Sequence, residues 1–95
     1  MKSNKLNEVM QLKTVVAPVV YSVIYAQATA NAQDGNEFAN KCNWSINEIA
    51  DRCRMKRESV KLAIEKLLKN GFIEQQGYFK SQRSNAKQSA LWALV

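Results

Sequence analysis

Apolar side chains recur at helical spacing in the middle of the chain. In residues 46–53 they fall on one face, and Ser45 with Glu48 three residues later has the pattern of a capping box. A second periodic segment covers residues 57–70 and stops before Gly71, a residue typical of the position after a helix. Its predicted buried stripe comprises Val60, Ala63, Ile64, Leu67 and Leu68. The pattern predicts two consecutive helices joined by a short turn.

A longer apolar segment, residues 15–32, precedes this pair. Its Val, Ile and Tyr residues favour strands locally, but Pro18 suits the first turn of a helix and the segment exceeds the length of a normal strand. We expect a helix that is apolar on nearly all sides, in the centre of a small bundle. Residues 1–13 fit either a short helix or a strand. In the polar loop that follows the long segment, Phe38 is expected to pack under the bundle.

The chain finishes with two apolar runs that flank a polar loop. A strand is predicted to begin at residues 72–73, a loop to cover residues 80–89, and a closing strand to cover residues 90–95. Residues 42–44 are predicted to add a short third strand. Alternation puts Trp92 on one face of the closing strand with Leu94, and the opposite face is also apolar. That second face predicts either packing by the N-terminal segment or a self-association surface.

Together these elements predict one α+β domain over residues 1–95, mainly α with a small β-hairpin. It comprises an N-terminal extension (1–13), a helix-turn-helix (45–71) and a wing hairpin (72–95). The order of helix, turn, helix and hairpin is that of a winged helix-turn-helix, with a three-helix core and a C-terminal wing. The most apolar stretch falls short of the roughly 20 residues that span a bilayer, so no membrane contact is expected.

Charge is distributed unevenly along the chain. The net charge is +6, but residues 1–51 carry −1 and residues 52–95 carry +7. Such a basic half suits a polyanion, and with this fold the expected partner is double-stranded DNA. A solvated, solubilising surface is the alternative interpretation of the same charges.

The predicted second helix carries mixed signals for DNA contact. Its predicted exposed face comprises Glu58, Ser59, Leu62, Glu65, Lys66 and Lys69. Two glutamates and a leucine thus occupy part of a face on which Arg, Lys, Asn or Gln usually reads base edges. We therefore expect this helix to be a poor reader of the major groove. Its N-terminal end and flanks suit phosphates, and the candidate contacts are Arg54, Lys56, Arg57, Ser59, Lys61 and Lys66.

The hairpin has the opposite bias, because residues 75–95 contain no acidic side chain. Cations and hydrogen-bond donors at a loop tip can reach phosphates or minor-groove edges. The candidate contacts are Lys80, Gln82, Arg83, Ser84, Asn85, Lys87 and Gln88. A basic wing is thus predicted as a main DNA contact, and an ordinary solvated hairpin tip is the alternative.

Other chemistry is limited by composition. The chain has two cysteines, Cys42 and Cys53, and no histidine, which removes most zinc sites and histidine-dependent catalysis. We expect no enzymatic activity, metal or cofactor. Both cysteines are expected to be reduced thiols of a cytoplasmic protein, because two cannot form the disulfide framework of a small secreted domain. Trp44, Tyr78 and Trp92 can stack on single-stranded bases, but in so small a domain we predict core positions.

The segments WSINEIA (residues 44–50), MKRESV (55–60) and LLKNGFI (67–73) carry a resemblance to a family. They resemble the winged helix-turn-helix of bacterial plasmid and phage proteins, and the likeness covers roughly residues 15–95. It implies a sequence-specific, non-enzymatic binder of duplex DNA that marks a site for conjugative transfer, replication or partition. A relaxase or replication proteins would be its partners, and the chain resembles a plasmid accessory protein such as the relaxosome component of clostridial conjugative plasmids. The chain departs from the family pattern at Lys56, where a serine cap is usual, and at Glu58, where a basic residue is usual.

Two other functions stay open. A transcriptional repressor would bind a palindromic operator as a homodimer. A protein-interaction adaptor would use the exposed Leu62 and the doubly apolar final strand.

Overall fold

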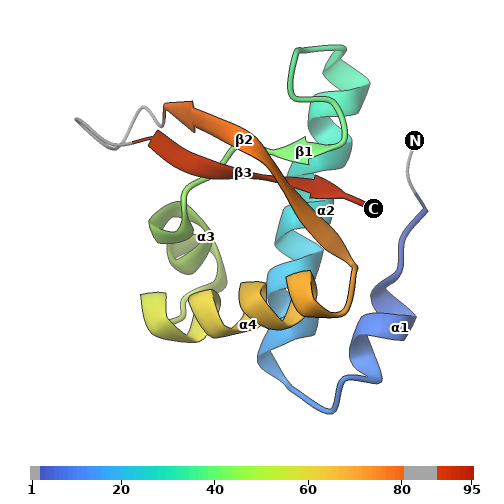
Figure 1. The fold of residues 1–95 in the computed structure, drawn as a ribbon, viewed down its shortest axis with the longest axis vertical. Coiled ribbons are helices and arrows are strands. Elements are labelled where there is room, and N and C mark those ends of the chain that lie inside the picture. Colours follow the sequence, from blue (N-terminus) through green and yellow to red (C-terminus); the bar gives the residue numbers. More distant parts are fainter. Residues whose placement is uncertain (1–2, 81–87) are drawn as a thin grey trace.

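The structure, a computed structural model, describes residues 3–80 and 88–95. In these residues the elements follow in the order α1 (Leu6–Met10), α2 (Val16–Asp34), β1 (Lys41–Cys42), α3 (Ile46–Cys53), α4 (Arg57–Lys69), β2 (Ile73–Lys80) and β3 (Gln88–Leu94). The strands form one antiparallel sheet in the order β1-β3-β2. Four helices with a C-terminal hairpin in a three-stranded sheet make an α+β domain, consistent with a winged-helix-like arrangement (Figure 1).

The predicted long helix is confirmed as α2, which packs against α1, α3, α4, β1 and β3. Pro18 lies in its first turn, where a missing N–H costs no helical hydrogen bond. The helix ends at Gly35, whose φ of 67° is left-handed. The N–H groups of Gly35 and Asn36 donate to the carbonyls of Ala32 and Asn31, which is the Schellman pattern.

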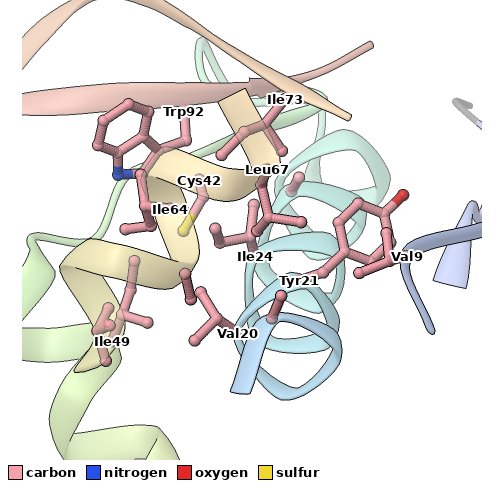
Figure 2. Close-up of a cluster of buried hydrophobic side chains, with 14 of the residues drawn as sticks. Val9, Val20, Tyr21, Ile24, Cys42, Ile49, Ile64, Leu67, Ile73 and Trp92 are labelled. Atoms are coloured by element: carbon pink, nitrogen blue, oxygen red, sulfur yellow. The ribbon is translucent and has the colours of Figure 1, made fainter. Parts of the chain in front are cut away.

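The hydrophobic core lies between the helices and the inner face of the sheet (Figure 2). Ile24 of α2 and Leu67 of α4 meet Ile73 and Trp92 of the hairpin there. Val9 of α1 is fully buried in the same cluster. The segment 1–13, for which the sequence left helix and strand open, thus contributes a helix to the core.

The capping box at the start of α3 is confirmed. The hydroxyl of Ser45 accepts from the Glu48 N–H at 3.2 Å, and the Glu48 carboxylate accepts from the Ser45 N–H at 3.0 Å. At the end of α4, Gly71 has a φ of 76°. Here the N–H of Phe72 donates to the Leu67 carbonyl at 3.0 Å, so the glycine stop predicted from the sequence closes a second Schellman pattern.

The hairpin strands are longer than predicted. β2 reaches Lys80 and β3 begins at Gln88, both of which the sequence assigned to the loop, because their polar side chains face solvent while their backbones pair. β1 begins one residue earlier than predicted and excludes Trp44, which is half-buried. Among the aromatics, Trp92 is in the core as predicted, but Tyr78 is 63% exposed and its core prediction is wrong.

A bulge in β2 decides which face its side chains take. Gln75 pairs with Trp92 and Tyr78 pairs with Ala90, so β2 advances three residues while β3 advances two. Within this bulge Gly77 has a left-handed φ of 79°. The extra residue turns Phe79 to the outer face of the sheet, opposite Ile73. There Phe79 packs edge-on against Phe38, with ring centroids 6.3 Å apart.

The outer face of β3 is therefore not covered as the sequence predicted. Leu91 and Ala93 are buried on that face, which they share with Phe79. α1 packs on α2 instead. Of the two alternatives for this face, packing by the N-terminal segment is therefore wrong, and self-association stays a prediction. Phe38, expected under the bundle, contacts the sheet instead.

Candidate nucleic-acid interface

The end of the hairpin that leads to residues 81–87, helix α3 and the N-terminal end of α4 lie on the same side of the domain (Figure 1). The turn between the helices is short because Arg54 takes a left-handed φ of 54° immediately after α3. Its N–H donates to the Asp51 carbonyl and that of Met55 to the Ala50 carbonyl, which fixes the direction of the next helix. The fold thus collects cations of the turn and hairpin on one side.

A pocket of about 290 Å³ lies where these elements meet. It is lined by Ser45, Ile46 and Asn47 at the start of α3, Arg57 at the start of α4, and Gln88, Ser89, Ala90 and Trp92 of β3. None of these lining residues is acidic. The pocket therefore brings one cation of the helix-turn-helix beside hydrogen-bonding side chains of the hairpin.

Most of the predicted contact residues in the helix-turn-helix are accessible to a ligand. Ser59 is half-buried, because it lies on the side of α4 next to the buried stripe. The exposed residues of this group are Arg54, Lys56, Arg57, Lys61 and Lys66. Lys69, which the sequence placed on the same face of the helix as Lys66, is exposed as well.

In the hairpin, Lys80 and Gln88 are exposed and pair across the two strands, so the structure places them side by side. The other predicted wing contacts, Gln82, Arg83, Ser84, Asn85 and Lys87, lie outside the described residues.

The far face of α4 presents the carboxylates and the leucine that the sequence indicated. Glu58 and Glu65 are exposed, and Leu62 is 66% exposed. Val60, Ala63, Ile64 and Leu67 are buried on the opposite face, and Leu68, the remaining residue of the predicted stripe, is half-buried against the core. The helical periodicity thus correctly separated the two faces.

Sequence reasoning missed one contact at this surface. The guanidinium of Arg52 lies over the indole ring of Trp44, 4.7 Å from the ring centroid, which is a cation–π geometry. Glu48 and Asp51 line a pocket with these two side chains. Carboxylates adjoin this cation, so this side of α3 suits phosphates less well than the Arg57 side. Trp44, Glu48 and Arg52 recur every four residues, and this helical spacing is the signal in the sequence that could have indicated the contact.

The cysteine thiols offer no nucleophile. Burial, the main cause, raises the pKa of the Cys42 thiol to about 12, and burial also raises the pKa of Cys53. Both are free thiols, and they stay protonated near neutral pH because the thiolate is the disfavoured form. In residues 3–80 and 88–95, no cluster of three or more His, Cys, Asp or Glu side chains has the arrangement of a metal site.

Within the described part of the chain, no helix combines the length and hydropathy that a bilayer crossing requires. Comparison of the sequence and the fold with known protein families, curated proteins and solved structures finds no match. The function of this surface is therefore inferred from its residues and not from a matched relative.

Proposed function

We propose that this protein is a non-enzymatic, sequence-specific binder of double-stranded DNA. The observation that carries the proposal is that the α3–α4 turn and the end of the hairpin lie on the same side of the domain (Figure 1). The turn carries the exposed Arg54 and Lys56, and the described end of the hairpin carries the exposed Lys80. Residues 52–95, which supply this surface, have a net charge of +7. Cations that displace the condensed counterions of a duplex provide much of the affinity of DNA-binding proteins.

The two parts of the surface would contact DNA differently. Arg54, Lys56 and Arg57 at the start of α4 would bind backbone phosphates and set the orientation of the domain. Lys80 and Gln88, and the basic residues of the segment between them, would reach the backbone or the adjacent minor groove. The resemblance to plasmid and phage proteins supports an accessory role, in which the protein marks a site for transfer, replication or partition.

A titration of duplex DNA at rising salt concentration tests this proposal. The logarithm of the affinity should fall linearly with the logarithm of the salt concentration, with a slope of about 0.9 per phosphate contacted. Affinity that is absent at low salt, or that does not respond to salt, would exclude the function.

A pair of charge-matched variants localises the contact. Arg54→Gln with Lys56→Gln should lower the affinity and reduce the salt slope by about two. Lys13→Gln with Lys41→Gln removes the same charge outside the proposed surface, and Lys13 has a left-handed φ of 57° much like the 54° of Arg54. The control pair should keep the salt slope of the wild type.

The exposure of Leu62 favours an adaptor that binds another protein as a second function. In that case the variant with Arg54→Gln and Lys56→Gln would still bind its protein partner although it has no affinity for DNA. A repressor would instead require a dimer on a palindromic site, which sedimentation with and without DNA detects.

A further inference from the structure

Helix α4 exposes one continuous ridge opposite its buried stripe. With 3.6 residues per turn, Glu58, Leu62, Glu65 and Lys69 fall within about 60° of one another around the helix axis. All four are exposed, and Leu62 is among the most exposed large apolar side chains of the described residues, at 66%. The outermost line of α4 is therefore a leucine between two carboxylates.

Cations flank this ridge on both sides. Lys61 lies about 60° to one side of Glu58 around the axis and Lys66 about 80° to the other, and both are exposed. A major groove has the matching arrangement, because base edges form its floor and a phosphate backbone runs along each wall. The lysines would meet the phosphates and offset the repulsion that the carboxylates bring.

We propose that, contrary to the expectation from the sequence of a poor reader of the major groove, this ridge reads pyrimidines there, with Glu58 and Glu65 specifying cytosine and Leu62 specifying thymine. The inference rests on the proposed DNA binding and adds the sequence that is bound. Cytosine offers its N4 amino group as a donor, which a carboxylate accepts, and thymine offers its C5 methyl group to an apolar side chain. The N7 acceptors of adenine and guanine repel a carboxylate, so purines facing the glutamates are rejected.

The spacing along the helix sets the length of the site. Glu58 and Glu65 are separated by about 10.5 Å at a rise of 1.5 Å per residue, with Leu62 between them. This distance equals about three base steps of 3.4 Å for a helix that lies along the groove. The ridge thus predicts cytosine near both ends of a stretch of about four base pairs and thymine inside it.

Selection of bound duplexes from a random pool, followed by chemical editing of the selected site, tests the role of Leu62. Replacing the specified thymine by uracil removes only the C5 methyl group. This replacement should weaken binding of the wild type about fourfold, the value of one buried methyl group. In the Leu62→Ala variant, replacing thymine by uracil should not weaken binding any further.

Substitution of a glutamate by glutamine tests whether the carboxylate specifies cytosine. Glu58→Gln should shift the selected base at one position from cytosine to adenine, because glutamine pairs with the N6 and N7 atoms of adenine. Glu37→Gln is the matched control: it removes an exposed carboxylate from the loop before β1 and should select the wild-type site. Circular dichroism verifies that each variant is folded.

Each outcome has a separate meaning. If the wild type binds thymine and uracil sites equally and Glu58→Gln selects the wild-type site, α4 does not read the groove, although the DNA-binding function stands. If the folded wild type binds no duplex at low salt, both the function and the inference are overturned.

Discussion

The side-chain nitrogen of Asn31 donates to Oδ1 of Asn43 at 2.9 Å and links the end of α2 to the segment that leads into α3. The same nitrogen donates to the Lys41 carbonyl at 2.9 Å. Its Oδ1 accepts from Gln27 and from Asn36, each at 3.1 Å. Asn31 is only 3% exposed, so every hydrogen bond of this amide is made inside the protein. This network positions β1 and, through it, the start of α3.

We expect Asn31→Ala to lower the free energy of unfolding by about 3 kcal/mol, because it removes the four hydrogen bonds that this buried amide makes with Gln27, Asn36, Lys41 and Asn43. Asn31→Asp keeps the shape but removes the donor that faces two oxygen atoms, so it should be at least as destabilising. Asn47→Ala, at an exposed position of α3, is the control and should stay within about 0.5 kcal/mol of the wild type. Urea unfolding measures all three, and a stable Asn31→Ala would contradict the role of the network.

Helix α4 begins without a side-chain cap, since Lys56 occupies the N-cap position and makes no capping hydrogen bond. Lys56→Ser should raise the free energy of unfolding by about 1 kcal/mol, because a serine hydroxyl accepts from a free N–H of the first turn. The same change should weaken DNA binding by removing a cation. Lys61→Ser removes the same charge within the helix and should give no stabilisation; equal stabilities for the two variants would contradict the capping argument.

The buried thiol of Cys42 makes stability depend on pH. Its pKa rises from an ordinary value of 9.0 to about 12 in the folded state, mainly through burial. The folded protein keeps the proton that the unfolded chain loses, so this contribution is complete below pH 9 and disappears as the pH rises toward 12. We expect a loss of about 1.4 kcal/mol per pH unit in this window.

Unfolding in urea at several pH values between 8 and 11 measures this loss. Cys42→Ala should remove the largest part of the slope, whereas Cys53→Ala should remove less of it, because the pKa of this half-buried thiol is also raised by burial. An identical slope in the wild type and Cys42→Ala would assign the pH dependence to other groups.

The bulge in β2 depends on the backbone of Gly77. An added Cβ there meets no atom within 4 Å, so only the left-handed φ of 79° opposes a side chain. Gly77→Ala should cost about 1–2 kcal/mol of stability, and Gly77→Asn should cost less because asparagine tolerates this conformation better. Thermal unfolding of the two variants provides the comparison; a larger loss for Asn would indicate a steric cause.

Local signals predicted the helices well. The capping box at Ser45 and the glycine at position 71 act within one turn of chain, so their hydrogen bonds are specified by neighbouring residues. The hairpin was predicted less well. The bulge at Gly77 shifts the alternation of side chains, and residue spacing alone places Phe79 on the wrong face.

The sequence by itself determined the order of elements after residue 13, most of the buried stripe of α4 and the concentration of positive charge in residues 52–95. These properties depend on residues close together in the chain or on composition. Only the tertiary structure decided that Phe38 covers Phe79 and that Arg57 lines a pocket with Gln88. Such contacts join residues brought together by the packing of helices and strands, and that packing depends on the whole core.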